Sequence, residues 1–321
     1  MTAGLERLTR ALYERGYEQR LRVNEPLARY TSFAIGGPAD LLIVANRLEE
    51  LQELINLAAA KDVPVTMLGS GTNVLVADAG IRGLVVINNC QAHTINDAGM
   101  LTAQSGCLLR ELARWTVEQS WKGLEWAVGV PGTLGGAVVG NAGAYGGSMS
   151  DIVRRVKLLR PDGSVAWSDA SVMEYAYRTS ALKRQPHNGR RAMVLEVDMQ
   201  LSPGDPQELR AVVERITEQR QMRTPEGCCA GSIFKRTMQY PAGFLIEQAG
   251  LKGYRVGGAE VSPKHANFLM NTDGATAADV KALIEHIQAR VLEAFGQLLE
   301  PEIEFVGEWP AEDRGCESAA C

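Results

Sequence analysis

Apolar residues recur at helical spacing along several stretches of this chain. Leu5, Leu8 and Leu12 share one face of a predicted helix over residues 5–20. We expect further helices over residues 47–61, 107–120, 206–222, 243–249 and 276–295. Short apolar runs bounded by turn residues predict strands, among them 41–44, 83–87, 100–104, 153–160, 164–167, 192–201 and 302–306.

The order of these elements indicates a mixed fold. A strand, a helix and a strand follow one another between residues 41 and 87, as in a small open sheet. Pro161, Asp162 and Gly163 separate two predicted strands as a hairpin turn. The run Ser-Pro-Gly-Asp-Pro over residues 202–206 marks a boundary between two parts of the chain.

The strongest concentration of glycine lies over residues 128–147, which read VGVPGTLGGAVVGNAGAYGG. Glycine loses much entropy on ordering, and it is useful where the backbone takes a positive φ or where bare N–H groups approach a ligand. A flexible linker is the alternative. Because Leu134, Val138 and Tyr145 interrupt the run, whereas linkers are rich in Ser and charge, we expect a ligand cradle.

A second glycine loop follows an apolar strand and consists of Gly69, Ser70, Gly71, Thr72 and Asn73. It lacks the third glycine, the following helix and the distant acidic residue of a dinucleotide-binding fingerprint. The pattern favours a turn whose N–H groups hold phosphate oxygens, with a plain hairpin turn as the alternative.

Composition narrows the class of protein. With 321 residues, 45% hydrophobic residues, 22% charged residues and a net charge of −5, the chain is typical of a globular protein of two or three units without a nucleic-acid footprint. No apolar run approaches a membrane span, and the charged N-terminus lacks a signal-peptide core, so we expect a cytoplasmic protein. Six cysteines without CxxC spacing and four scattered histidines predict no metal site.

Eight motifs in order resemble the UDP-N-acetylenolpyruvoylglucosamine reductase family, flavin enzymes of peptidoglycan precursor synthesis. The resemblance spans nearly all of residues 30–307. Each motif is weak alone, but eight in register are specific. They are TSFAIGGPAD, GSGTNVLV, GVPGTLGGAVVGNAGAYGG, YRTS, AGSIFK, AGFLIEQAGLKG, VSPKHANFLMN and LEPEIEFVG.

The resemblance implies an α+β fold with a two-lobed FAD-binding module of the vanillyl-alcohol-oxidase type and a C-terminal α/β substrate-binding domain. The implied division is an N-terminal helix and lead-in over 1–29, the FAD module over 30–202 with lobes of about 30–90 and 91–202, the substrate domain over 203–307 and a flexible tail over 308–321 with Cys316 and Cys321. The short stretch between Arg178 and Ser232 resembles the lid-less type II subclass.

The implied reaction is NADPH-dependent and FAD-mediated. It reduces the enolpyruvyl ether of UDP-N-acetylglucosamine enolpyruvate to UDP-N-acetylmuramate, and negative charge develops on the carbon that bears the carboxylate. Arg178, Ser232 and Glu302 match the family's catalytic residues. The absence of His from both glycine loops argues for non-covalent FAD, with His93 and Cys107 the only nearby candidates for a covalent tether.

Each catalytic residue suits its implied role, and each has a structural alternative. The Arg178 guanidinium can grip a carboxylate through two hydrogen bonds, unless it is a surface arginine near a turn. The Ser232 hydroxyl can protonate a strongly basic carbanion, with Lys235 as a possible support for the alkoxide; a helix cap or turn is the alternative. Glu302 helps only if it holds a proton, which requires a raised pKa.

Strand alternation puts Glu300, Glu302 and Glu304 on one face, so spacing alone cannot rank them, and a solvated acidic edge is the alternative for all three. Only the family motif selects Glu302.

For Arg220 and Arg223, a place on a solvated charged face is an equally good alternative to a role in binding. The substrate contacts implied by the resemblance are Tyr177, Lys235, His265, Arg220 and Arg223, and the FAD contacts are Gly69, Ser70, Gly71, Thr72, Asn73, Pro131, Gly132, Thr133, Gly136, Asn141 and Gly143.

Two features depart from the family pattern. Arg236 and Thr237 replace the usual asparagine-proline or arginine-proline after the FK pair, and Cys228 and Cys229 replace proline-serine.

The rival function is a flavin oxidoreductase of the same type that acts on a small alcohol. A second rival is a nucleotide-binding module without activity. As partners we expect the UDP-sugar and NADPH, without nucleic acid or membrane, and a monomer or weak homodimer.

Overall fold

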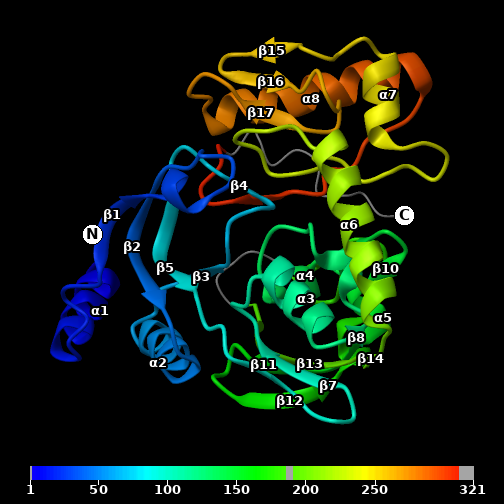
Figure 1. Ribbon diagram of the computed structural model, residues 1–321. Coiled ribbons are helices and arrows are strands. Elements are labelled where there is room, and N and C mark those ends of the chain that lie inside the picture. Colours follow the sequence, from blue (N-terminus) through cyan, green and yellow to red (C-terminus); the bar gives the residue numbers. More distant parts are fainter. Residues whose placement is uncertain (1, 186–190, 311–321) are drawn as a thin grey trace. The chain divides into compact units, whose positions relative to one another are not determined.

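The computed structural model describes residues 2–185 and 191–310. Contacts within the chain divide it into two compact units. Unit 1 comprises Met1–Leu21, Leu42–Ser70 and Leu84–Thr224, and unit 2 comprises Arg22–Leu41, Gly71–Gly83 and Pro225–Cys321. The α+β class is confirmed, because helices and strands alternate in both units (Figure 1).

The helices and strands of unit 1 are α1 Ala3–Glu14, α2 Leu48–Ala59, β3 Val65–Leu68, β6 His93–Ile95, β7 Met100–Gln104, α3 Leu109–Glu118, β8 Trp121–Lys122, α4 Leu134–Val139, β9 Gly143–Ala144, β10 Gly147–Ser148, α5 Met149–Ile152, β11 Val153–Leu159, β12 Val165–Asp169, β13 Met193–Gln200, β14 Ser202–Pro203 and α6 Pro206–Arg223. Short 3-10 helices occur at Glu125–Ala127 and Ala170–Met173.

The elements of unit 2 are β1 Arg22–Pro26, β4 Val74–Val76, α7 Ala242–Gln248, β15 Arg255–Val256, β16 Ala259–Val261, β17 Leu269–Asn271, α8 Ala277–Phe295 and β18 Glu304–Val306, with a 3-10 helix at Leu27–Tyr30. Two further strands, β2 Pro38–Ala45 and β5 Ile81–Asn88, contain the points where the chain passes from one unit to the other.

Unit 1 is built on a sheet with the strand order β12-β11-β13-β7-β6, in which the pairs of neighbouring strands are antiparallel. The turn predicted at residues 161–163 joins β11 to β12, and the Gly163 amide donates to the Arg160 carbonyl at 2.9 Å. Helices α3 and α4 cover one face of this sheet (Figure 1). Their apolar side chains, among them Leu109, Leu112, Leu134 and Val138, are buried in one core with side chains from the strands.

The predicted open sheet is present with the strand order β1-β2-β5-β3, and β3 and β5 run parallel. Unit 2 contains a smaller antiparallel sheet, β15-β16-β17, against which α8 packs. Helix α8 begins with a reciprocal capping box between Thr276 and Asp279, and the Asp78 carboxylate accepts from the Ala277 amide at 2.8 Å and the Ala278 amide at 3.0 Å. Side chains from α7, α8 and the small sheet form the second core.

Three predictions need correction. The N-terminal helix ends at Glu14 rather than residue 20, because Gly16 adopts a φ of 81° that cannot continue a helix. The hairpin alternative for residues 69–73 is wrong, since β3 pairs with β5 whereas β4 pairs with β18. The linker alternative for residues 128–147 is also wrong, because this run contains α4 and contributes buried side chains to the core.

The division into units does not coincide with the predicted boundary at residue 202. Helix α6, which was expected in the substrate domain, belongs to unit 1. Residues 30–41 and 71–83, which were expected in the FAD module, belong to unit 2, as do residues 22–29 of the expected lead-in. The predicted tail lies outside the described residues from residue 311 onward, and Cys316 and Cys321 lie there.

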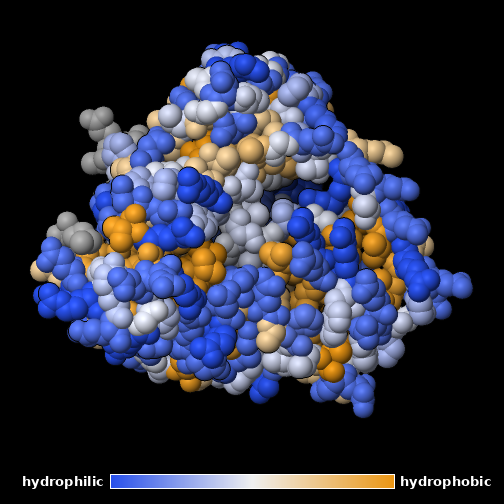
Figure 2. Space-filling model, turned by 60° about the vertical axis from the view of Figure 1, so that its left-hand side comes forward, coloured by the Kyte–Doolittle hydropathy of each residue, from blue (hydrophilic) through white to orange (hydrophobic). Residues whose placement is uncertain are grey.

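The surface is mostly hydrophilic on the face drawn in Figure 2, where apolar residues appear in separate small groups. Among residues 2–185 and 191–310, no helix combines the length and the apolar character that a membrane span requires.

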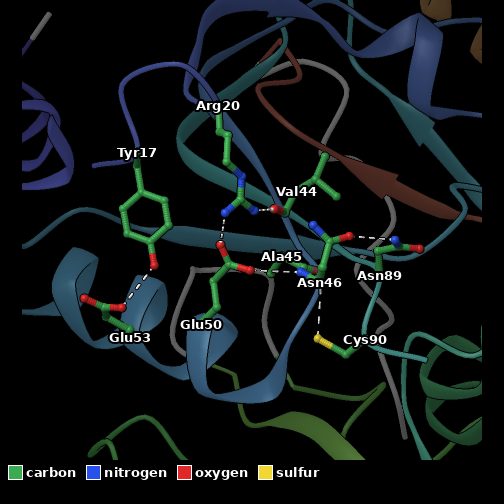
Figure 3. A network of polar contacts seen from close by, with 9 residues as sticks. All are labelled: Tyr17, Arg20, Val44, Ala45, Asn46, Glu50, Glu53, Asn89 and Cys90. Atoms are coloured by element: carbon green, nitrogen blue, oxygen red, sulfur yellow. Dashed lines mark hydrogen bonds and ion pairs between the residues drawn. The ribbon is translucent and has the colours of Figure 1, made fainter. Parts of the chain in front are cut away.

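A buried carboxylate of α2 bonds to the segment that follows α1 (Figure 3). The Glu50 side chain is only 4% exposed, and it forms an ion pair with Arg20 at 2.5 Å and accepts from the Asn46 amide at 3.0 Å. The Tyr17 hydroxyl donates to Glu53 at 3.0 Å, and burial together with Glu53 raises the pKa of Tyr17 to about 12. Glu50 therefore depends on Arg20 for its charge compensation in the interior.

We predict that Arg20→Ala destabilises the protein by about 3 kcal/mol, at the low end for loss of one partner of a buried pair because Arg20 is itself partly exposed. Arg15→Ala is the matched control, since Arg15 and Glu53 also form an ion pair but both side chains are about half exposed. Its loss should cost no more than about 1 kcal/mol. Urea denaturation measures both, and equal losses would contradict the assignment.

Candidate functional site

The glycine-rich run of unit 1 is held tightly by the protein itself. At its centre, α4 buries Leu134 and Val138 completely. The first two amides of this helix are already bonded, because Leu134 donates to the Cys107 carbonyl and Gly135 donates to the Ser105 carbonyl, both at 2.8 Å. The run is therefore a fixed surface rather than a loose loop.

The two glycine loops meet at Gly69 and Thr133, both in unit 1. A Cβ atom on Gly69 would lie 2.2 Å from Thr133 Oγ1, so only glycine allows this approach. The resulting contact brings together two segments whose sequences predicted phosphate binding. Their separation of more than sixty positions in the chain gives no hint of it.

Gly71 is required by the protein before any ligand is considered. Its φ is 59°, and a Cβ atom there would lie 2.2 Å from the Tyr30 carbonyl oxygen. The Gly71 carbonyl in turn accepts from the Ser32 amide at 3.1 Å. This contact within unit 2 is therefore sufficient to require glycine at position 71, whether or not the loop also binds phosphate.

Gly136, unlike Gly69 and Gly71, is not crowded by other atoms of the protein. It is exposed, and a Cβ atom built on it would meet only Thr133 Oγ1, at 3.7 Å. Pro131, five positions earlier, is exposed as well. The protein leaves open space over Gly136, as a cradle for a ligand requires. This part of unit 1 fits the phosphate-bearing portion of a dinucleotide such as FAD.

Arg178 lies in a tight turn of unit 1. Ala176 and Thr179 exchange backbone hydrogen bonds of 3.1 and 3.2 Å, and Arg178 takes a φ of 57° at the corner between them. The Arg178 Nε atom is buried, and its guanidinium carbon lies 5.8 Å from the centre of the exposed Tyr177 ring. Arg178 is thus a partly buried turn residue, unlike the surface arginine that was the alternative.

The turn that carries Arg178 is attached to the end of α4. Asn141 Nδ2 donates to the Ala176 carbonyl at 2.9 Å, and Ser180 Oγ donates to the Val139 carbonyl at 2.6 Å. Asn141 Oδ1 also accepts from the Ser150 amide at 3.0 Å. Asn141 was predicted to bind the cofactor. In the structure, its side-chain amide nitrogen and oxygen both form hydrogen bonds with backbone groups. Gly143 similarly faces Gly147 and Ser148 across the β9–β10 pair.

Ser232 and Glu302 lie together in unit 2. The Glu302 amide donates to the carbonyl of Ile233, the residue after Ser232, at 2.7 Å. Ser232 forms a bridge with Phe268, so it is part of an extended segment and does not cap a helix. Both residues are half-buried. Two of the three predicted catalytic residues are therefore brought together, while Arg178 belongs to unit 1 and its place beside them stays a prediction.

The structure separates Glu300 from Glu302 and Glu304, which are both half-buried. Glu300 forms an ion pair with Lys235 Nζ, and the Glu300 side chain is 70% exposed. The Glu304 amide donates to the Asn73 carbonyl at 2.9 Å at the start of β18. Glu302 is half-buried, which does not match a fully solvated acidic edge.

Asn73 connects the glycine loop to Glu302 within unit 2. Its Nδ2 donates to the Glu302 carbonyl at 3.1 Å. Asn73 was predicted as a cofactor contact, and here its side chain holds the backbone of a predicted catalytic residue. Sequence analysis missed this role because the two residues are 229 positions apart.

The remaining predicted substrate contacts are divided between the units. In unit 2, His265 Nδ1 accepts from the Asn267 amide at 3.1 Å, so the neutral ring carries its proton on Nε2. In unit 1, Arg220 Cδ occupies the place where a Cβ atom of Gly129 would be, so Arg220 packs against the glycine-rich run. Arg223 is exposed at the end of α6, where a cation also favours the helix dipole.

Known proteins resemble the chain along most of its length. Residues 39–169 match the FAD binding domain, and residues 223–306 match the C-terminal domain of UDP-N-acetylenolpyruvoylglucosamine reductase. The UDP-N-acetylenolpyruvoylglucosamine reductase of Caldanaerobacter subterraneus subsp. tengcongensis is 42% identical over 91% of this chain and 95% of its own length. That of Exiguobacterium sibiricum is 39% identical over 94% and 98%.

The chain belongs to the UDP-N-acetylenolpyruvoylglucosamine reductase family. A solved structure of this family, from Thermus caldophilus, is similar with a TM-score of 0.74 and 32% identity, and it covers 90% of this chain and all of that one. The family resemblance expected from the eight motifs is thereby confirmed, and FAD is the family's cofactor.

Neither Cys107 nor His93 is well suited to a covalent bond with FAD, which some rival flavin oxidoreductases form. The Cys107 thiol is buried, and burial raises its pKa to about 11, so little reactive thiolate forms near neutral pH. His93 packs edge-on against Trp115 with ring centres 4.6 Å apart. The small-alcohol alternative is not favoured, because the two reductases named above match 91% and 94% of this chain.

The adjacent Cys228 and Cys229 accept hydrogen bonds through their backbone carbonyls. The Cys229 carbonyl accepts from Ser32 Oγ at 2.7 Å, and the Cys228 carbonyl accepts from the Asn271 amide at 2.9 Å. Burial also raises the pKa of the Cys229 thiol. These bonds do not depend on the side chain, which explains why the family's usual proline-serine pair can be replaced here.

We predict that Gly71→Ala destabilises the FAD-free protein, because the new Cβ atom would collide with the Tyr30 carbonyl in addition to the cost of a positive φ. Gly250→Ala is the control. Gly250 has a φ of 73° in the same unit, but no atom lies within 4 Å of its Cβ position. Thermal denaturation without FAD should show the larger loss for Gly71→Ala, by at least about 1 kcal/mol; similar losses would refute the steric argument.

Proposed function

We propose that the chain catalyses the NADPH-dependent reduction of UDP-N-acetylglucosamine enolpyruvate to UDP-N-acetylmuramate with non-covalent FAD. The observation that carries the proposal is the backbone hydrogen bond between Glu302 and Ile233, the residue after Ser232, in a member of this enzyme family. When bound, FAD supplies hydride transfer from NADPH to the terminal carbon of the enolpyruvyl group.

Unit 1 and the loop after β3 would hold the cofactor. The exposed residues Pro131 and Gly136, together with the half-buried Gly132 and the neighbouring Thr133, suit the diphosphate of FAD. Ser70 and Thr72 would add hydroxyl donors from the loop that contacts Thr133 through Gly69. Polar hydrogen atoms directed at phosphate oxygens are the usual means of binding such groups.

The substrate's carboxylate and its neighbouring carbon determine what the three catalytic residues do. Addition of hydride to the terminal carbon breaks the carbon–carbon π bond and moves its electron pair toward the carbon that bears the carboxylate. Arg178 would bind this carboxylate and stabilise the developing charge. Ser232 Oγ would give its proton to that carbon, and a proton from water would then restore the hydroxyl.

Glu302 would stabilise the developing charge in its protonated form, which requires a pKa above that of an ordinary glutamate. The Lys235 ammonium, paired with Glu300, lies on the same extended segment as Ser232 and would favour the serine alkoxide or the substrate diphosphate. His265, Tyr177, Arg220 and Arg223 would contact the UDP portion. We also propose that the protein acts in the cytoplasm as a monomer or weak homodimer, with the UDP-sugar and NADPH as partners and no nucleic acid or membrane.

The direct test of the reaction is anaerobic. NADPH should abolish the visible absorbance of the bound flavin, and UDP-N-acetylglucosamine enolpyruvate should restore it. Failure of the sugar nucleotide to restore the absorbance would reject the proposed function.

We predict that Ser232→Ala leaves flavin bleaching by NADPH nearly unchanged and slows the return of absorbance by about 10²–10⁴-fold, the usual contribution of a positioned acid. Ser232→Thr keeps a hydroxyl and is the control. Stopped-flow absorbance separates the two half-reactions. Equal losses in both would remove Ser232 from the role of proton donor.

We predict opposite effects of Gly136→Ala on stability and on cofactor binding. The added methyl group has room in the protein alone and improves helix propensity by up to about 1 kcal/mol. It would occupy the space proposed for the FAD diphosphate and should weaken FAD binding at least tenfold, about 1.4 kcal/mol. Gly140→Ala, at the other end of α4, is the control. Titration calorimetry measures the affinity of each variant for FAD. Equal affinities of the two variants would contradict the proposed cradle.

A further inference from the structure

Asn267 makes an unusual set of bonds to the segment that carries Ser232. Its side chain is buried, with the whole residue 7% exposed. Oδ1 accepts from the Phe234 amide at 3.0 Å, and Nδ2 donates to the Phe234 carbonyl at 2.9 Å. The backbone carbonyl of Asn267 accepts from the Ile233 amide at 2.9 Å. One residue thereby satisfies three backbone polar groups of Ile233 and Phe234.

The other edge of the same segment is bonded to the stretch around Glu302. The Ile233 carbonyl accepts from the Glu302 amide at 2.7 Å, and the Lys235 amide donates to the Glu300 carbonyl at 2.9 Å. Ile233 and Phe234 are almost completely buried, so their backbone groups have no access to bulk water. The position of Ser232 relative to Glu302 is therefore set by hydrogen bonds from both edges.

A primary amide is suited to this place. Phe234 presents one donor and one acceptor, and only a side chain with both an acceptor and a donor in one plane satisfies the pair. A carboxylate would direct an oxygen at the Phe234 carbonyl, and a hydroxymethyl group would be too short to reach both atoms. An apolar side chain would leave two buried backbone groups without partners.

We propose that Asn267 is a positioning residue for proton transfer. Its amide fixes the backbone of Ile233 and Phe234, and this fixes the Ser232 hydroxyl beside Glu302. The inference rests on the proposed function of Ser232 as proton donor. Because Asn267 does not need to touch FAD or substrate for this role, its loss should affect the step that uses Ser232 and leave flavin bleaching by NADPH intact.

The test uses Asn267→Ser and Asn267→Asp in the full-length holoenzyme. Asn271→Ser is the matched control, because the side chain of Asn271 in the same unit also bonds backbone groups. These are the Phe33 carbonyl at 3.0 Å, the Ala34 carbonyl at 3.4 Å and the Ala275 amide at 2.8 Å. Bleaching by NADPH should stay within about twofold in every variant. Restoration of absorbance by the enolpyruvyl substrate should slow about 10²-fold in the Asn267 variants, as expected for a displaced catalytic group, but not in the control.

A second readout does not depend on activity. Deuterium exchange of the peptide that covers residues 231–236 should accelerate in Asn267→Ser and stay slow in Asn271→Ser, because only the first loses the acceptor of the Phe234 amide. This measurement also shows whether each variant is folded, since the peptides of α8 should remain protected. If Asn267→Asp does not fold, Asn267→Ser carries the test alone.

The double variant Ser232→Ala/Asn267→Ser distinguishes positioning from a general loss of structure. If Asn267 acts through Ser232, the double variant is no slower than Ser232→Ala. Multiplied losses, or a wild-type rate for Asn267→Ser beside a slow Ser232→Ala, would overturn the inference. A fast Ser232→Ala would instead reject the proposed role of Ser232, so the two failures are distinguishable.

Discussion

The Ser232–Lys235 segment depends on backbone hydrogen bonding between pieces of chain that belong to no long strand. It lies between Asn267 on one edge and the Glu300–Glu302 stretch on the other, and its central residues are buried. A buried peptide group without a partner costs on the order of 1–3 kcal/mol, so the protein cannot let these segments separate cheaply. The same bonds hold the backbone of Ile233, the residue after Ser232, against the backbone of Glu302.

Unit 1 uses the same principle with different residues. The turn that carries Arg178 has a strained corner, and it is attached to α4 through Asn141 and Ser180. Helix α4 is in turn packed into the core of the main sheet. A packed helix therefore supports the turn that carries Arg178, which suits the proposed role of its guanidinium in stabilising charge.

The glycines divide into those the protein needs and those it leaves open. Gly69 and Gly71 are excluded from carrying a Cβ atom by Thr133 and Tyr30, whereas Gly136 has open space above it. Close packing of the first kind builds the surface, and the second kind leaves it accessible. Glycine content alone cannot distinguish the two, because both read as the same letter.

The sequence by itself determined the helices and strands with clear periodicity, the α+β class, the hairpin at residues 161–163 and, through eight motifs, the family. It also selected Ser232 and Glu302, which the structure brings together, and the two glycine loops, which meet at Gly69 and Thr133. Only the tertiary structure decided what Asn73, Asn141 and Asn267 do, and to which unit α6 belongs. The physical reason is that a side chain bonded to a distant backbone group leaves no period in the chain, whereas an amphipathic helix or strand repeats its pattern at every turn or pleat.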